Sequence, residues 1–248
     1  MTVLHPHTAM VLAAGLGKRM RPITNTIPKP LVKVAGKTLL DWGLDSLAAS
    51  GVAKAVVNIH YFPEQIVAHV ASRTKPHVVI SDESRELLDS AGGIVHALPE
   101  LGSRPFYILN ADTFWIEGTK APTHGRNLAR LALAWKPGAM DILLMLARLD
   151  QATGHSGSTD FLVAADGHLS RAAGDPAGLI YAGAAIVDPA IFAGASAVPH
   201  SLNGYFDRAI ANGRLFGMAM DGSWITVGTP DAIPHAEAAV ANARAPAV

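Results

Sequence analysis

Short apolar segments alternate with helical segments in the N-terminal half, and this alternation limits the fold more than any other feature of the chain. Strands are predicted over residues 10–14, 55–59, 78–80 and 106–109. Helices are predicted between them, over residues 38–50 and 63–72, and the first has Thr38 as its cap and Gly51 as its stop signal. Alternating β and α units favour a mostly parallel sheet between two layers of helices. The expected fold is therefore α/β and Rossmann-like, with three layers, a mixed and mostly parallel central sheet, and helices on both faces.

The second half of the chain has a different rhythm. Extended segments are predicted over residues 141–149, 160–163, 179–187, 215–220 and 224–227. Because few helices are predicted between them, we expect antiparallel strands to extend the sheet. A terminal helix is predicted to follow, with Thr229 as its N-cap and Pro230 at its first position. No linker or repeat interrupts the chain, so one domain is expected over residues 1–248.

Composition excludes several classes of function. Half of the 248 residues are apolar, and cysteine is absent, which excludes disulfides, thiolate zinc sites and a cysteine nucleophile. Lys and Arg together number 20, as do Asp and Glu, so the basic excess of a nucleic-acid-binding protein is missing. The apolar runs are too short for a membrane span, and the positive charges near residues 9–16 follow the apolar run instead of preceding it as in a signal peptide. We expect a cytoplasmic protein that binds neither nucleic acid nor membrane.

A glycine-bearing loop follows the first predicted strand, in the sequence LAAGLGKRMRP. Glycines at such a loop let main-chain N–H groups surround phosphate oxygens, and three basic side chains follow here. A dinucleotide-binding fingerprint needs a small residue where Met20 stands. A P-loop needs glycine at Leu12 and serine or threonine at Arg19. The loop is therefore a candidate phosphate loop of a kind other than these two. A G-x-G pair alone often marks only a tight turn, so the prediction depends on the basic residues beside it.

A second basic element lies shortly after this loop. Lys29 stands between Pro28 and Pro30, and two prolines restrict the backbone that carries its ammonium group. A lone P-K-P sequence is more often a solvated turn. Its nearness to the glycine loop favours a role in binding phosphate.

The combination of L-A-A-G-x-G-x-R-M with P-K-P-L resembles the signature of the sugar nucleotidyltransferases, also called nucleotide-sugar pyrophosphorylases. The resemblance extends over about residues 9–240. It implies that the nucleoside triphosphate is bound by the loop residues Leu12, Ala13, Ala14, Gly15, Gly17 and Lys18. It also implies that Arg19 holds the departing phosphates and that Lys29 contacts the phosphates around the reacting centre.

An acidic residue follows the predicted strand over residues 106–109, in the sequence Asn110-Ala111-Asp112. The carboxyl ends of parallel strands are where α/β sheets bind ligands. Taken alone, Asp112 is equally able to cap the next loop. The resemblance implies that it coordinates Mg²⁺, which makes Mg²⁺ the expected cofactor.

Other segments resemble the parts of the family that contact the nucleoside and the sugar. Four residues are candidates for nucleoside binding: Glu83, Ser90, Gly92 and Gly93. The two glycines are also compatible with a simple helix-entry turn. Asn110, Asp160 and Gly183 match positions that face the sugar in relatives.

The family usually has a second metal-binding aspartate in a W-x-D-x-G-T motif. Here Thr226 occupies that position, so the expected metal residues are Asp112 and Thr226.

Two hypotheses follow for the function: an active Mg²⁺-dependent transferase, or a nucleotide-sugar-binding regulatory protein without turnover. For the enzyme, likeness along the whole chain favours UTP and N-acetylmuramate 1-phosphate in cell-wall sugar recycling, with GTP and mannose 1-phosphate as the alternative. A monomer or small homo-oligomer is expected.

Overall fold

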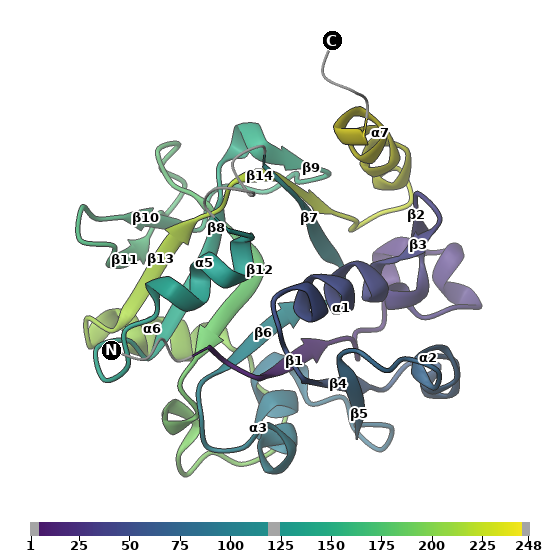
Figure 1. Ribbon diagram of the computed structural model, residues 1–248, viewed down its shortest axis with the longest axis horizontal. Coiled ribbons are helices and arrows are strands. Elements are labelled where there is room, and N and C mark those ends of the chain that lie inside the picture. The colour runs from purple at the N-terminus through teal and green to yellow at the C-terminus, as the bar shows by residue number, and fades with distance from the viewer. Residues whose placement is uncertain (1–4, 119–124, 245–248) are drawn as a thin grey trace.

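The computed structural model describes residues 5–118 and 125–244. A seven-stranded sheet lies at its centre, in the order β13-β8-β12-β6-β1-β4-β5 (Figure 1). In chain order its strands are β1 (Thr8–Leu12), β4 (Lys54–Ile59), β5 (His77–Asp82), β6 (Phe106–Asn110), β8 (Ile142–Ala147), β12 (Ile180–Val187) and β13 (Leu215–Ala219). Only β12 is antiparallel to its neighbours, β6 and β8. The sheet is therefore mixed and mostly parallel, as predicted.

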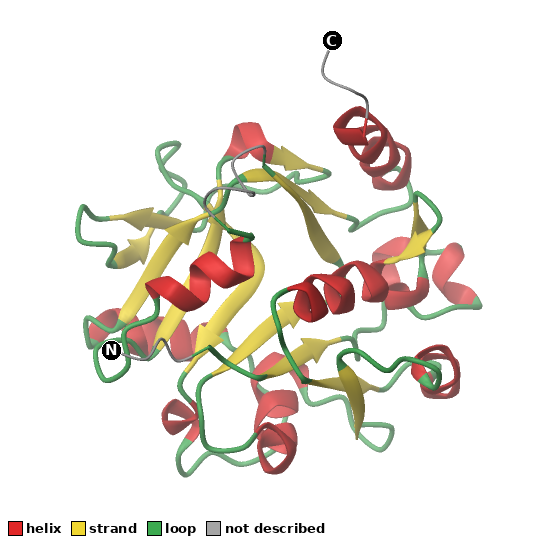
Figure 2. Cartoon of the chain, in the orientation of Figure 1, coloured by secondary structure: helices red, strands yellow, loops and turns green. Residues whose placement is uncertain are grey.

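Helices cover both faces of this sheet. Leucines of α1 (Leu39–Ala49) and α5 (Asn127–Ala134) share one buried cluster with Ile66 and Val70 of α2 (Pro63–Val70). The opposite cluster contains α3 (Asp89–Leu101) and α6 (Asn203–Ala211). In Figures 1 and 2, α1 and α5 lie on the viewer's side of the strands. The three-layer α/β fold is confirmed.

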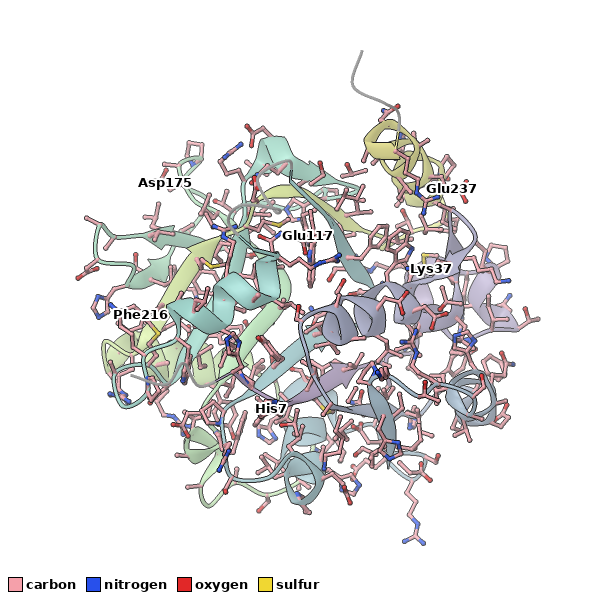
Figure 3. All side chains as sticks on the ribbon, in the orientation of Figure 1. His7, Lys37, Glu117, Asp175, Phe216 and Glu237 are labelled. Carbon is pink, nitrogen blue, oxygen red and sulfur yellow. The ribbon has the colours of Figure 1, made fainter. Side chains whose placement is uncertain are left out.

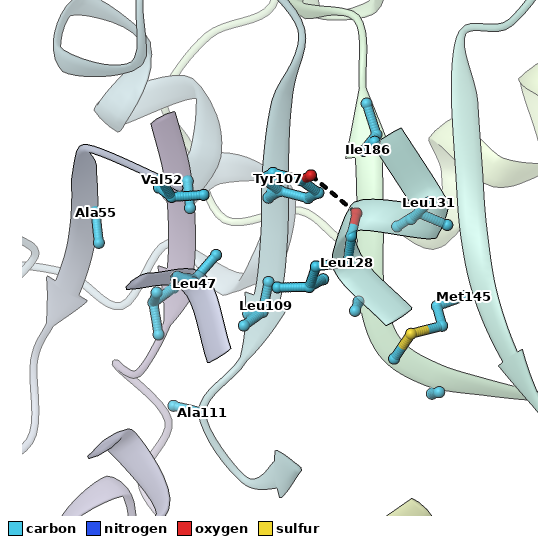
Figure 4. Close-up of a cluster of buried hydrophobic side chains, with 14 of the residues drawn as sticks. Leu47, Val52, Ala55, Tyr107, Leu109, Ala111, Leu128, Leu131, Met145 and Ile186 are labelled. Carbon is cyan, nitrogen blue, oxygen red and sulfur yellow. Dashed lines mark hydrogen bonds between the residues drawn. The ribbon is translucent and has the colours of Figure 1, made fainter. Parts of the chain in front are cut away.

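The core between α1, α5 and the sheet contains mainly aliphatic side chains, and Figure 4 shows part of it. Tyr107 of β6 is fully buried, and its hydroxyl donates to the Leu128 carbonyl of α5 at 3.0 Å. This hydrogen bond satisfies a polar group that would otherwise cost stability in the core. Burial also raises the pKa of Tyr107 above its usual value. Each fully buried leucine around it, such as Leu47, contributes about 2 kcal/mol through the hydrophobic effect.

Smaller elements surround the central sheet. A three-stranded sheet contains β7 (Thr113–Glu117), β14 (Gly222–Thr226) and β9 (Ala152–Thr153). Two-stranded sheets pair β2 (Lys33–Val34) with β3 (Lys37–Thr38) and β10 (Phe161–Val163) with β11 (Leu169–Arg171). Short 3₁₀ helices are η1 (Lys18–Met20), η2 (Ile23–Asn25), η3 (Lys29–Leu31), η4 (Leu149–Gln151) and η5 (Pro189–Phe192). The helix α7 (Ala232–Arg244) packs on β9 and β14.

Two expectations for the second half were wrong. The strands predicted at residues 160–163 and 224–227 do not extend the central sheet, because β10 pairs with β11 and β14 pairs with β7. In addition, β13 runs parallel to β8. The chain leaves β12 at Val187, which pairs with Ile142, and it enters β13 at Leu215, which pairs with the same residue, so β13 starts at the end of the sheet where β8 starts. Periodicity identifies a strand but does not identify the strand with which it pairs.

The two predicted helix starts had different outcomes. Thr38 caps α1 as predicted, because its hydroxyl accepts from the Asp41 N–H at 3.1 Å. The terminal helix begins at Ala232 instead of Pro230. Residue 234 is a proline, so it has no N–H to donate to the Pro230 carbonyl. In a helix that began at Pro230, the ring of Pro234 would also clash with that carbonyl. No helix among residues 5–118 and 125–244 is long and apolar enough to cross a membrane.

Candidate active site

Two cavities meet at the carboxyl ends of β1 and β6. The main cavity has a volume of about 490 Å³, and it is lined by Leu12, Ala13, Ala14, Gly15, Lys29, Pro30, Asn58, Leu87, Asp89, Ser90, Asn110, Ala111 and Asp112. The smaller basic cavity has a volume of about 220 Å³, and it is lined by Gly15, Gly17, Lys18, Arg19, Lys29, Asp112 and Gly228. In the sheet, β4 lies on one side of β1 and β6 lies on the other, and the chain passes from β1 to β4. This is the kind of crevice in which open α/β sheets bind ligands.

Close packing against η2 and η3 fixes the glycine loop. Gly17 has φ +60°, and a Cβ on it would lie 3.0 Å from both Lys29 Cβ and Thr24 Cγ2. The Gly17 carbonyl accepts from the Thr24 hydroxyl at 2.8 Å, and Tyr61 donates to the Thr24 carbonyl at 2.9 Å. Glycine is therefore needed at position 17 both for its backbone conformation and for space. By contrast, nothing lies within 4 Å of the place where a Gly15 Cβ would stand, so the main chain there is open to a ligand.

Lys29 and Asp112 form the junction of the two cavities. The Lys29 Nζ lies 2.6 Å from Asp112 Oδ2, and the two side chains are 11% and 36% exposed. The Asp112 carbonyl accepts from the Val227 N–H at 3.1 Å, which attaches this turn to the end of β14. A partly buried ion pair of this kind holds both groups in place, and the exposed part of the carboxylate remains accessible from the cavities.

The basic cavity has an excess of positive charge. Lys18, Arg19 and Lys29 line it together with the single carboxylate of Asp112. Gly228 lies across from Arg19, since a Cβ on this glycine would stand 3.7 Å from an Arg19 guanidinium nitrogen. Three cations around one small cavity attract an anion with several charges, such as a polyphosphate.

The wall made by β4 contains Asn58, a residue that was not predicted from the sequence. Asn58 is 2% exposed and lines the main cavity. Its Oδ1 accepts from the Ala13 N–H at 2.6 Å, and its Nδ2 donates to Glu83 Oε1 at 2.7 Å. The only signal in the sequence was an amide inside an otherwise apolar strand.

The segment predicted to contact a nucleoside forms the start of α3. Ser90 lines the main cavity, and its hydroxyl accepts from the Leu202 N–H at 2.9 Å. Glu83, at 2% exposure, does not line either cavity, and its carboxylate accepts from Asn58 and from the Leu88 N–H. Gly92 and Gly93 lie inside α3, after its first three residues, and neither lines the main or the basic cavity. Whether Glu83 or Ser90 contacts a base stays a prediction.

Of the three candidates on the sugar side, only Asn110 lines the main cavity. Asn110 lines it, and Gly183 lies directly behind, because a Cβ on this glycine would stand 3.2 Å from the Asn110 Cβ. Asp160 lies outside the lining of either cavity, and its carboxylate accepts from the Tyr181 N–H at 2.8 Å. Thr226 also lies outside both linings, although the next residue, Val227, bonds the main chain of Asp112.

Carboxylates for a metal ion are few at this site. The described residues contain no group of three or more His, Cys, Asp or Glu side chains arranged to hold a metal. Among the residues that the structure describes, Asp112 lines both cavities, and Asp89 is the other carboxylate that lines the main one. One carboxylate suits Mg²⁺, which usually completes its coordination with substrate phosphates and water. It does not suit a metal that requires a full set of protein ligands.

Comparisons with known proteins agree with this geometry. A family model described as nucleotidyl transferase matches residues 8–122. An N-acetylmuramate alpha-1-phosphate uridylyltransferase from Caulobacter vibrioides is 44% identical over 243 residues, which cover 96% of this chain and 98% of that protein. A protein of the same name from Neisseria meningitidis serogroup B is 32% identical and covers 93% of this chain and 96% of its own.

A solved structure shares the fold at low sequence identity. The inositol-1-phosphate CTP transferase from T. maritima matches with a TM-score of 0.74 at 16% identity, and the match covers 99% of both chains. The family model includes the glycine loop, Lys29 and Asp112, and the relatives from the two bacteria extend over nearly the whole chain. The chain belongs to the sugar nucleotidyltransferase family.

Proposed function

We propose that this protein joins UTP to N-acetylmuramate 1-phosphate, with UDP-N-acetylmuramate and pyrophosphate as products. The observation that carries the proposal is the Lys29–Asp112 pair at the junction of a large cavity and a basic one. The two bacterial relatives described above have this activity in their names. The main cavity lies within the size range of small-ligand sites, and the basic cavity suits a departing polyphosphate.

The reaction exchanges one phosphoanhydride bond for another. A phosphate oxygen of the sugar 1-phosphate forms a bond to the α-phosphorus of UTP. The bond from that phosphorus to the bridging oxygen breaks, and its electron pair leaves with pyrophosphate. Such transfers depend on positioning and on stabilising charge, so no nucleophilic side chain is needed. In this scheme Lys18 and Arg19 neutralise the pyrophosphate, and Lys29 holds the two anionic reactants together.

We further propose that Mg²⁺ is held by Asp112 and the substrate phosphates. The exposed part of the Asp112 carboxylate and its position at both cavities fit this role. When bound, Mg²⁺ supplies neutralisation of charge on the phosphate oxygens. The ammonium of Lys29 occupies part of the same carboxylate, so Lys29 holds Asp112 oriented until the reactants arrive.

Pyrophosphate release tests the activity directly. The purified protein is assayed with UTP, GTP, CTP and dTTP, each combined with N-acetylmuramate 1-phosphate, mannose 1-phosphate or glucose 1-phosphate. We expect turnover to be fastest with UTP and N-acetylmuramate 1-phosphate. Fastest turnover with GTP and mannose 1-phosphate would support the alternative pair. Nucleotide binding without pyrophosphate release from any pair would replace the enzyme with the binding-only regulatory protein.

The Mg²⁺ requirement is tested at Thr226, the position at which the family resemblance implies a second metal-binding aspartate. A threonine hydroxyl is a weaker metal ligand than a carboxylate. We expect Thr226→Asp to lower the Mg²⁺ concentration for half-maximal activity, and we expect Asp112→Ala or added EDTA to abolish turnover. An unchanged Mg²⁺ dependence in Thr226→Asp, or an active Asp112→Ala variant, would place the metal on other residues.

The setting of the activity is also proposed. We place the enzyme in the cytoplasm, in the recycling of cell-wall sugars, as a monomer or small homo-oligomer. Cell fractionation measures the location, and sedimentation of the full chain measures the oligomeric state.

A further inference from the structure

We propose that Asn58 and Glu83 are positioning residues that set the affinity for the nucleotide by holding two walls of the main cavity at a fixed separation. The inference rests on the proposed function, because it takes the ligand of this cavity to be UTP. Neither side chain is assigned a part in the bond exchange.

A chain of buried hydrogen bonds joins the two walls. The Ala13 N–H, on the wall that leads into the glycine loop, donates to Asn58 Oδ1 at 2.6 Å. Asn58 Nδ2 donates to Glu83 Oε1 at 2.7 Å. On the other side, the Leu88 N–H donates to Glu83 Oε2 at 3.1 Å. Leu88 lies between two residues that line the cavity, Leu87 and Asp89. Ala13 and Leu88 are therefore connected through the side chains of one pair.

The main chain of Glu83 is held as firmly as its carboxylate. The Glu83 N–H donates to the Ile59 carbonyl at 2.9 Å, and the Glu83 carbonyl lies 2.8 Å from His60 Nδ1. The carboxylate accepts from the N–H of Leu88, the N-cap residue of α3, and the helix dipole favours negative charge at this end of a helix. A Cβ on Gly93 would stand 2.5 Å from Glu83 Oε1 and 2.8 Å from Asn58 Nδ2. The helix thus leaves a space that the pair fills completely.

The pair is complementary in its donors and acceptors. Both carboxylate oxygens of Glu83 are needed, because one accepts from Asn58 and the other from Leu88. Asn58 must direct its oxygen toward Ala13 and its amide nitrogen toward Glu83. A glutamine at position 83 has one acceptor for two donors. An aspartate at position 58 directs an oxygen at the Glu83 carboxylate. Each of these isosteric changes therefore breaks one connection between the walls.

Exchanging the two functional groups restores every bond. In the double variant Asn58→Asp/Glu83→Gln, one oxygen of residue 58 accepts from Ala13 and the other accepts from the new amide of residue 83. The remaining oxygen of residue 83 accepts from Leu88. The double variant therefore distinguishes a requirement for the connection from a requirement for either side chain alone.

The experiment measures the Kd of Mg-UTP by calorimetry and the KM of each substrate for N58D, E83Q and the double variant. We expect each single variant to raise the Kd and KM of UTP about tenfold, the factor for one broken buried hydrogen bond. We expect the KM of the sugar 1-phosphate to stay within about twofold. Its candidate residue Asn110 lies on β6, and neither the Ala13–Asn58 bond nor the Glu83–Leu88 bond involves that strand. The double variant is expected to return to within about threefold of the wild-type UTP affinity.

A matched control separates positioning from general stability. Asn127 is another fully buried asparagine that bonds a glutamate, and it lies outside the lining of both cavities. Asn127→Asp should lower the melting temperature without changing the UTP Kd. Unchanged UTP affinity in folded single variants, or no recovery in the double variant, would overturn the inference. Failure of the wild-type protein to bind UTP would instead overturn the proposed function.

Discussion

Two regions of this molecule contain nearly the same set of polar groups, yet only one of them has the arrangement of an active site. The cavity region contains the Lys29–Asp112 ion pair at 2.6 Å and the Asn58–Glu83 pair. The second region lies around Glu117, at the end of β7, and Lys37 (Figure 3). It contains the Lys37–Asp45 ion pair at 2.7 Å and the Asn127–Glu117 pair. It also has a cavity, with a volume of about 250 Å³.

The difference lies in what the polar groups bond. In the second region, Asn127 bonds the main chain of Asp221 in both directions, and Glu117 accepts from the Trp115 indole. These contacts connect structural elements to one another. The bonded residues of both regions line a cavity, but the cavity held by Asn58 and Lys29 lies at the carboxyl ends of β1 and β6, whereas the cavity beside Glu117 lies away from them. Residue type and burial alone do not distinguish the regions, whereas position in the sheet does.

The largest contrast is expected between the two lysines. Lys29→Ala should reduce kcat by at least about 100-fold, because removing a donor that stabilises developing charge costs about 3–4 kcal/mol. Lys37→Ala, which breaks an ion pair of similar length, should leave kcat within about twofold, since exposed pairs contribute little. Steady-state kinetics with UTP and N-acetylmuramate 1-phosphate measure both. A similar loss in the two variants would remove the distinction between the regions.

Two glycines sharpen the comparison through packing. Gly93→Ala should destabilise the fold by about 1–3 kcal/mol and weaken UTP binding, because the added methyl overlaps the Asn58–Glu83 pair. Gly204→Ala in α6 should be neutral or stabilising by up to about 1 kcal/mol, since nothing lies within 4 Å of its Cβ. Urea unfolding and a UTP titration measure the two effects. Full UTP affinity in Gly93→Ala would show that the pair can shift without moving the walls.

In the second region, exchanging the amide of Asn127 and the carboxylate of Glu117 should not restore the stability of the fold. Asn127→Asp costs about 1–3 kcal/mol of stability, because the Asp221 carbonyl loses its donor. Adding Glu117→Gln removes the repulsion between carboxylates but provides no donor for that carbonyl. The double variant should therefore regain only part of its melting temperature. Complete recovery by thermal melting would mean that the two pairs are equivalent in their bonding.

The smallest effect concerns acid stability in the second region. Burial would raise the pKa of Asp45, but hydrogen bonds from Lys37 and Arg73 lower it below its usual value of about 3.9. Because the folded-state pKa is the lower one, the contribution of this carboxylate is complete above the unfolded value and is lost as the pH falls through the folded value. Asp45→Asn should lower the melting temperature by about 2 °C at pH 7. At pH 2 the two proteins should have the same melting temperature. A difference that stays constant from pH 7 to pH 2 would show that protonation of Asp45 does not affect stability.

Much of the fold and part of the site could be predicted from the sequence. The glycine loop, Lys29 and Asp112 stand beside recognisable turn and strand signals, and the structure places them around adjoining cavities. Asn58 escaped prediction because its role depends on Ala13 and Glu83, and those contacts exist only after the strands pair. The pairing of β14 with β7 escaped for the same reason. Local signals are present in the sequence, whereas partners distant in the chain are not.

The position of Gly228 also has a consequence for the order in which the protein becomes functional during its synthesis. The basic cavity takes residues from the start of the chain, such as Arg19, and completes its wall with Gly228. The turn at Asp112 is likewise fastened by Val227. Domains begin to fold while the ribosome is still adding residues. A nascent chain that has not yet exposed residues 227 and 228 therefore has its glycine loop but an incomplete basic cavity, and we expect it to gain activity only after those residues have left the ribosome.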